Sequence, residues 1–299
     1  MSAAPVTPLV DVRQVRRAFA RAAAGYDATA VLQREIATRM LERLDYVKIQ
    51  PGTIIDLGCG TGASLAALGE RYPQARILGV DISEAMLHVG NRQRSRLRWM
   101  LPFLRGPKRA SLLAADAQAL PLKTGAAGFV WSNLMLHWLA DPLAGLREMH
   151  RSLEVGGLLM FSTFGPDTLK ELRYSFIDKH PHTLRFIDMH DYGDMLLECG
   201  FENPVMDVET ITMTYDRLDD LFLELRRNGA ACAMEDRQRG LMGRQAWQQA
   251  REAYATQRLE GRFPASFEVV YGHAWKALPK RTAEGDAIIN VIKPMKSER

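Results

Sequence analysis

The sequence predicts an α/β fold, a doubly wound and mostly parallel sheet of seven strands with N-terminal helices and a helical insertion. Two observations predict it. Short apolar runs alternate with helical patterns from residue 53 onward, and a glycine-rich turn follows the first of these runs. The 299 residues are 47% hydrophobic and 25% charged, which is ordinary for a globular protein and excludes collagen-like, low-complexity and wholly disordered chains.

The first 50 residues are expected to form a helical lid. Apolar residues recur at three-to-four spacing over 11–45, with a break at 25–27 that separates two helices. Pro51 and Gly52 then mark a turn into the sheet.

Strands and helices alternate over the next 150 residues. The apolar runs predict strands at 53–57, 76–80, 111–115, 128–132 and 157–163. Helices are expected from about Ser83, over 142–153 and over 189–199, the last ending at Gly200. Such βα repeats favour a parallel sheet with helices on both faces.

The pattern changes after residue 200. Residues 205–215 and 266–277 alternate like strands that close the sheet, and 216–262 reads as polar and helical. We therefore expect one domain over 51–278, with a helical insertion at about 217–262 and a flexible tail over 279–299.

The basic excess is local. The formal net charge is +4, but residues 92–109 hold seven cations and no acid, so the remainder is at −3. This arginine-rich loop could attract a nucleic acid, an anionic membrane or an acidic protein, or it could be a solvated surface; its role is left open.

Cysteine usage and the N-terminus point to a cytoplasmic protein. The three cysteines form no CxxC pair or Cys/His cluster, so neither a disulfide framework nor a metal site is expected. Residues 1–10 lack the features of a secretory signal, and no apolar run is long enough to span a bilayer.

The strongest motif is Asp56-Leu57-Gly58-Cys59-Gly60-Thr61-Gly62, which lies between a strand and a helix. Its glycines would let a ligand approach the backbone at the carboxyl end of the strand. A dinucleotide fingerprint competes, since Gly58, Gly60 and Ala63 fit GxGxxA, but a carboxylate at Asp56 would repel a pyrophosphate. The same carboxylate would attract an ammonium group. No P-loop lysine follows, which argues against a nucleoside triphosphate.

Two more acids end the next strands. Asp81 could accept hydrogen bonds from both hydroxyls of a ribose, and Asp116 could accept from the amino group of an adenine. Either alone could be a helix cap or a solvated strand end. Acids at three successive strand ends, with a glycine loop at the first, are hard to explain as caps.

Residues 50–165 resemble the class I S-adenosylmethionine-dependent methyltransferases, which have a Rossmann-like fold. The resemblance implies S-adenosylmethionine as cofactor, with the methionine part at the glycine loop, the ribose at the second strand and the adenine at the third. The cofactor-binding residues it implies are Asp56, Gly58, Gly60, Gly62, Asp81, Ile82, Asp116, Ala117 and Asn133. Asn133 belongs to the segment 129–138, which in that family faces the transferred methyl group.

A second resemblance covers about residues 12–278. It is to the malonyl-acyl carrier protein methyltransferases of biotin synthesis, and it is carried by residues 19–27, 32–34, 131–134, 161–169, 185–186, 226–230 and 264–275. It implies methylation of the free carboxylate of a malonyl thioester on acyl carrier protein. The methyl ester disguises that carboxylate from the chain-elongating enzymes.

This chemistry needs no general base, because a carboxylate is already ionised at neutral pH. It needs two reactants held in line and shielded from water. Arg185 is the candidate for orienting the malonyl carboxylate, Tyr26 for covering the cofactor as part of a lid, and His137 for lining the pocket with Trp138. Each has a purely structural alternative, as a salt bridge or a packing residue.

Acyl carrier proteins are acidic, so a basic docking surface is expected. The insertion offers a basic stretch made of Arg226, Arg227, Arg237, Arg239 and Arg244. Neither a nucleic acid nor a membrane is expected as partner.

Other functions fit part of the sequence. The related mitochondrial complex I assembly factor, a protein hydroxylase, shares the 136–138 and 164–173 stretches. A non-catalytic module that binds a cofactor or a nucleic acid could use residues 92–109. A quinone or small-molecule methyltransferase fits less well, since the insertion shows no apolar funnel.

Overall fold

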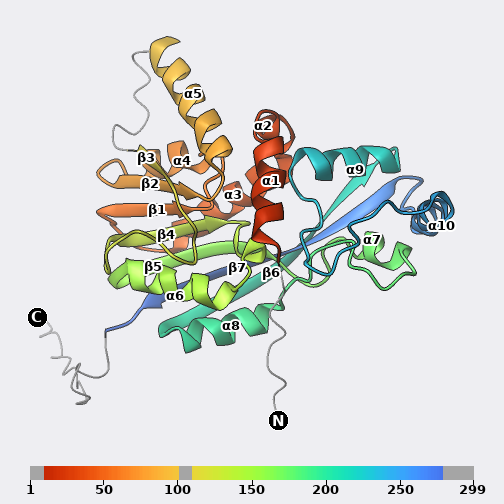
Figure 1. Ribbon diagram of the computed structural model, residues 1–299. Coiled ribbons are helices and arrows are strands. Elements are labelled where there is room, and N and C mark those ends of the chain that lie inside the picture. The colour runs from red at the N-terminus through yellow and green to blue at the C-terminus, as the bar shows by residue number, and fades with distance from the viewer. Residues whose placement is uncertain (1–9, 101–109, 279–299) are drawn as a thin grey trace, which may run out of the picture.

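The computed structural model describes residues 10–100 and 110–278. Its centre is one seven-stranded sheet in the order β3-β2-β1-β4-β5-β7-β6 (Figure 1). The strands are β1 Thr53–Leu57, β2 Arg76–Asp81, β3 Ala110–Ala114, β4 Ala127–Asn133, β5 Leu153–Phe164, β6 Phe201–Tyr215 and β7 Phe263–Lys276. Strands β1 to β5 pair in parallel, while β7 runs antiparallel to both β5 and β6. The predicted fold class is confirmed.

Helices cover both faces of the sheet (Figure 1). They are α1 Val12–Ala22, α2 Tyr26–Thr29, α3 Val31–Arg43, α4 Ser64–Arg71, α5 Glu84–Met100, α6 Pro142–Ser152, α7 Lys170–Ser175, α8 Met189–Glu198, α9 Leu218–Arg227 and α10 Arg244–Ala255, with 3-10 turns η1 Leu44–Tyr46 and η2 Leu136–Trp138. Successive strand residues alternate between the faces. Ile54 packs in the core under α3, α4, α9 and α10, and Ile55 packs in the core under α6 and α8. Both strand faces are therefore apolar, as parallel sheets require.

Three local expectations differ from the structure. Residues 92–100 of the supposed arginine-rich loop continue α5, because no glycine or proline interrupts them before Pro102; residues 101–109 lie outside the described residues. The insertion is helical only in α9 and α10, since Gly229, Gly240 and Gly243 punctuate the segment between them. Helix α7 was not expected, and the tail over 279–299 lies outside the described residues.

The N-terminal segment has two parts. Helices α1 and α2 lie over the carboxyl ends of the strands, whereas α3 packs into the core through Ile36 and Met40, both fully buried. Only α1 and α2 therefore have the placement that a lid requires.

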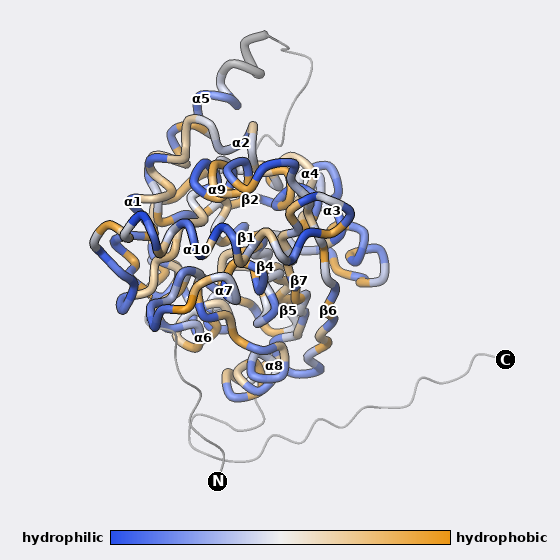
Figure 2. The backbone as a smooth tube through the Cα atoms, turned by 90° about the vertical axis from the view of Figure 1, so that its right-hand side faces the viewer, coloured by the Kyte–Doolittle hydropathy of each residue, from blue (hydrophilic) through white to orange (hydrophobic). Residues whose placement is uncertain are grey.

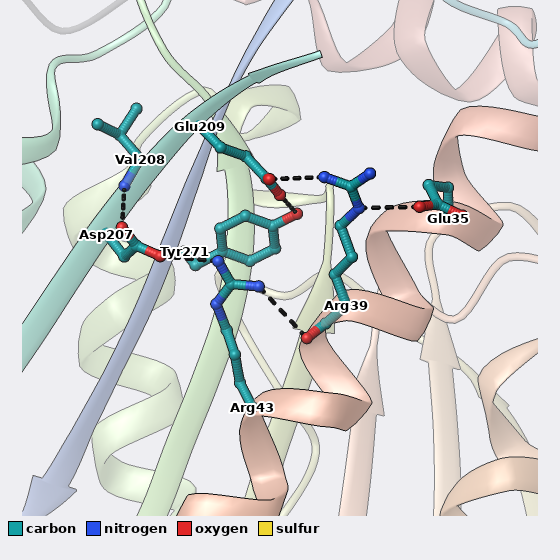
Figure 3. Close-up of polar contacts among 7 residues, drawn as sticks. All are labelled: Glu35, Arg39, Arg43, Asp207, Val208, Glu209 and Tyr271. Carbon is teal, nitrogen blue, oxygen red and sulfur yellow. Dashed lines mark hydrogen bonds and ion pairs between the residues drawn. The ribbon is translucent and has the colours of Figure 1, made fainter.

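A polar network fastens α3 to the antiparallel edge of the sheet (Figure 3). Arg39 bridges Glu35 on its own helix, at 2.9 Å, and Glu209 of β6, at 2.6 Å. The hydroxyl of Tyr271 on β7 donates to the other oxygen of Glu209 at 2.5 Å, and the guanidinium of Arg43 lies 3.7 Å from the centre of the Tyr271 ring. The network holds α3, and with it the residues that α3 contributes to the site.

No helix within the described ranges combines the length and apolar character needed to cross a bilayer.

Candidate functional site

The glycine loop after β1 has a backbone conformation that residues with a side chain rarely adopt. Gly58, Gly60 and Gly62 have φ of +79°, +56° and +85°, in the left-handed region. A Cβ on Gly58 would also lie 2.4 Å from the side chain of Met135. The loop is fixed to β2, because the amides of Gly58 and Cys59 both donate to the carbonyl of Val80. The result is an open cradle at the carboxyl end of β1.

A cavity of about 710 Å³ lies over this cradle, a size typical of small-molecule sites. Its floor is formed by the ends of β1, β2 and β4, its cover by α1 and α2, and one wall by α3. It brings together eleven residues singled out in the sequence: Tyr26, Asp56, Gly58, Gly60, Gly62, Asp81, Ile82, Asp116, Ala117, Asn133 and His137.

Asp56 is the most unusual group in the cavity. Its side chain is buried, and its Oδ2 has no hydrogen-bond partner among the described residues. Burial, and then the nearby charge of Asp81, raise the pKa of Asp56 to about 8. A buried acceptor without a partner is costly, so this oxygen calls for a donor, and a cationic one would be favoured most.

Asp81 and Asp116 are held in fixed orientations by neighbouring amides. The carboxylate of Asp81 accepts from the amide of Gly60 at 2.9 Å and from that of Ser83 at 2.7 Å. Burial raises the pKa of Asp81, and these two amides oppose the shift. Asp116 accepts from Gln118 through Oδ1 only. Both carboxylates keep lone pairs for a ligand.

Asp27 fastens the cover to the floor, a role that its sequence context did not predict. Its Oδ1 accepts from the hydroxyl of Thr61 in the glycine loop at 2.5 Å, and its Oδ2 accepts from Gln93 of α5 at 2.6 Å. The adjacent Tyr26 lies over the loop, where a Cβ on Gly60 would come within 3.9 Å of its ring. No local signal distinguishes Asp27 from other surface acids, because its partners lie 34 and 66 residues away.

His137 is buried and neutral. Burial lowers the pKa of His137 to about 3, so the ring carries no charge at physiological pH. Its Nδ1 lies 3.2 Å from the hydroxyl of Thr163, which lies 3.4 Å from the hydroxyl of Tyr192. The ring also packs against Trp138, Phe164 and Phe186.

Two predicted site residues are engaged elsewhere. Arg185 does not line the cavity, because its half-exposed guanidinium forms an ion pair with Asp236. Asn133 lines the cavity, but its amide donates to the carbonyl of Gln33 and accepts from the hydroxyl of Ser162. Its side chain therefore connects α3 to β4 and β5.

Three further polar groups reach the cavity without a complete set of partners. They are Gln33 Oε1, Arg94 Nη1 and Asn228 Oδ1, all enclosed and unpartnered within the described part of the chain. Asn228 lies in the stretch 226–230, which carries the family resemblance. Arg94 lies in the arginine-rich segment 92–109, to which the sequence assigned no role. Their place at the cavity follows from α3, α5 and α9 meeting there, which no local pattern reveals.

The site suits an amino-acid-bearing nucleoside. It offers a lone acceptor for an ammonium group, two more carboxylates at the next strand ends, and largely apolar walls. Within residues 10–100 and 110–278, no group of three His, Cys, Asp or Glu side chains could hold a metal ion.

Comparison with known proteins agrees with this chemical interpretation of the site. Residues 55–161 match the family model described as a methyltransferase domain. The YcgJ protein of Bacillus subtilis shares the fold, with a TM-score of 0.58 at 12% identity, over 82% of this chain and 100% of that one. The match to a methyltransferase domain and the chemistry of the site both support S-adenosylmethionine as the cofactor.

Two curated relatives are similar over almost their whole length. The malonyl-(acyl-carrier protein) O-methyltransferase of Gallionella capsiferriformans is 47% identical over 283 residues, which cover 94% of this chain and 96% of the relative. The enzyme of that name from Nitrosospira multiformis is 49% identical over 279 residues, which cover 91% of each. The chain therefore belongs to the family of malonyl-(acyl-carrier protein) O-methyltransferases.

Proposed function

We propose that this enzyme transfers the methyl group of S-adenosylmethionine to the free carboxylate of a malonyl group on acyl carrier protein. The malonyl methyl ester would start pimeloyl synthesis for biotin. The observation that carries the proposal is the unpartnered Asp56 carboxyl in an enclosed cavity, in a chain whose relatives named for this reaction match it almost end to end.

Three acids would hold the cofactor. Asp56 faces its ammonium group, and the positive charge would lower the pKa of Asp56 so that the pair is ionic. Asp81 accepts from the ribose hydroxyls, and Asp116 from the adenine amino group. Tyr26 lies above the glycine loop, and Asp27 keeps it there, which excludes water from the reacting atoms.

The reaction then needs positioning and little else. The bound cofactor supplies a methyl group activated by its sulfonium. The malonyl carboxylate is ionised at neutral pH, so no proton has to be removed. The protein's task is to align the carboxylate with the methyl group in a dry cavity, which can account for several powers of ten in rate.

Two neutral donors, together with the unpartnered Nη1 of Arg94, are candidates for orienting the carboxylate inside the cavity. If the hydroxyl of Thr163 donates to Nδ1 of His137, the proton of the ring lies on Nε2 and can be donated to an anion. The amide of Asn228 is a second donor at the same cavity. We assign Arg185 to the rim, where its pair with Asp236 leaves its guanidinium half exposed.

We place the enzyme in the cytoplasm.

The acidic carrier would dock on basic residues near the cavity. In the basic stretch of the insertion, Arg237 is already paired with Asp11 at 3.1 Å. Arg226, Arg227, Arg239 and Arg244 are exposed and have no ion pair within the described ranges. These four arginines are the part of the stretch that remains available to a partner.

Growth without biotin tests the proposal. A bacterial strain that lacks its own malonyl carrier methyltransferase should grow without added biotin when it produces this chain. The Asp81→Ala variant, which loses the ribose acceptor, should not restore growth. Failure of the wild-type chain to restore growth, although it is soluble and binds the cofactor, would contradict the assignment.

A further inference from the structure

We propose that the acidic carrier protein docks on α1, against a row of arginines that faces away from the cavity. We call this row, Arg13, Arg17 and Arg21, the α1 arginine face. The inference rests on the proposed function and adds to it the surface that receives the partner.

The row follows from the helical period. Val15, Ala18 and Ala22 form the buried side of α1. Arg13, Arg17 and Arg21 are four residues apart, so they share one side of the helix, opposite the buried one, and all three are exposed. None of the three has an ion pair in the described part of the chain, whereas Arg16, beside the row, is bound to Glu84 of α5.

This spacing does not serve the helix itself. Like charges four residues apart repel by a few tenths of a kcal/mol, and α1 contains no acid to offset them. Three unpaired arginines in that arrangement become favourable when an anionic surface covers them.

Basic residues from elsewhere in the chain also lie close to α1. The C-terminal end of α9 lies against α1, where a Cβ on Gly229 would come within 3.0 Å of the Phe19 ring, and the two helices are neighbours in Figure 1. That end carries the exposed Arg226 and Arg227. At the start of α1, the charge of Arg239 helps to lower the pKa of Asp11. Figure 2 shows how hydrophilic residues recur along α1 and α9.

The same helix forms part of the cavity wall. Val12, Val15 and Phe19 of α1 line the cavity on its inner side. A carrier bound to the outer side would therefore hold its thioester arm within about one helix diameter of the cavity. Arg244, the one member of the basic stretch on α10, has no such relation, because no residue of α10 lines the cavity.

Electrostatic attraction of this kind acts mainly on the association rate and weakens with salt. The test is reversal of charge in the triple variant Arg13→Glu/Arg17→Glu/Arg21→Glu. Its matched control reverses three exposed cations at the amino-terminal ends of the strands, away from the cavity. This control is Lys48→Glu/Arg76→Glu/Lys123→Glu, with Lys48 before β1, Arg76 at the start of β2 and Lys123 before β4. Both variants change the net charge equally.

Methyl transfer is measured on two substrates, the malonyl carrier and the malonyl thioester of N-acetylcysteamine, which has no carrier. We expect kcat/KM for the carrier to fall about tenfold or more in the α1 variant at low salt, with a weaker salt dependence than in the wild type. The ratio of carrier to carrier-free activity should fall by the same factor, and the control variant should keep the wild-type ratio.

Two results would overturn the inference. One is an α1 variant with the wild-type ratio in an enzyme that methylates the malonyl carrier normally. The other is binding of the α1 arginine face to duplex DNA or anionic vesicles, lost on reversal, while carrier kinetics stay as in the wild type. A wild-type enzyme that methylates neither substrate would instead contradict the proposed function, and the docking surface with it.

Discussion

The protonation of Asp56 makes cofactor binding depend on pH in a definite direction. The carboxyl is buried beside Asp81, with Oδ2 unpartnered, and its pKa is raised to about 8. Without cofactor it is therefore largely protonated at neutral pH. The ammonium group of S-adenosylmethionine favours the ionised form, so binding should expel the proton.

The size of the effect follows from the pKa. A carboxyl with a pKa of about 8 is about 0.9 protonated at pH 7, so binding should release about 0.9 proton. Since the free protein holds more protons than the complex, affinity rises with pH. The ionised fraction increases about fiftyfold between pH 6 and pH 8, and the association constant should follow it.

Titration calorimetry measures both quantities. Repeating the titration at pH 7 in buffers with different ionisation enthalpies gives the number of protons released. A series from pH 6 to pH 8 gives the slope of affinity. The Asp56→Asn variant should release no proton, show a flat profile and bind about tenfold or more weakly at pH 8, because it lacks the charge.

The pH dependence of folding stability gives a second test of the raised pKa of Asp56. The folded-state pKa lies above the unfolded value of 3.8, so the contribution of Asp56 to the stability of the cofactor-free protein should fall as pH rises from about 4 to about 8, while buried His137 contributes with the opposite sign up to about pH 6.5. Asp56→Asn should lessen this loss. Cofactor affinity that is constant from pH 6 to pH 8, with no proton released, would refute the assignment of Asp56 to the ammonium group.

Three other predictions follow from the contacts. Asp27→Ala should weaken cofactor binding about five- to thirtyfold, because two hydrogen bonds are lost. A double-mutant cycle with Thr61→Val should show coupling between the two residues, and strictly additive effects on binding would argue against the contact between cover and loop. His137→Phe should lower kcat on the malonyl carrier, with cofactor affinity retained. The turnover of the wild-type enzyme should show no titration near pH 6.5, because His137 is neutral there, and a change of rate at that pH would mean that the ring becomes charged. Arg39→Met should lower the free energy of unfolding by about 1–3 kcal/mol in urea, with an unchanged midpoint counting against the network.

Local patterns predicted most of the fold and most of the residues that line the cavity around the glycine loop. The apolar runs predict β1 to β5 within a few residues, apart from an earlier start of β5, because a strand buried on both faces must be apolar throughout. The glycine loop and the acids at Asp56, Asp81 and Asp116 were recognisable, since parallel strands end at the same edge of the sheet.

The rest depends on contacts between distant segments. Asp27 and Asn228 reach the cavity because α2 and α9 fold over the sheet; both lie in stretches that carry the family resemblance, but no local pattern there predicts their contacts. Arg185 was assigned from its charge, but Asp236, distant in sequence, takes up that charge. Charge patterning alone does not reveal which cations are already paired.

The most direct test of the central claim is the product of the reaction itself. The enzyme is incubated with S-adenosylmethionine and either malonyl or acetyl carrier protein, and the intact carriers are weighed by mass spectrometry. We predict the addition of one methyl group to the malonyl carrier, carried by the malonyl moiety that is released when the thioester is cleaved, and none to the acetyl carrier, which has no free carboxylate. Methylation of both carriers, or of neither, would contradict this prediction.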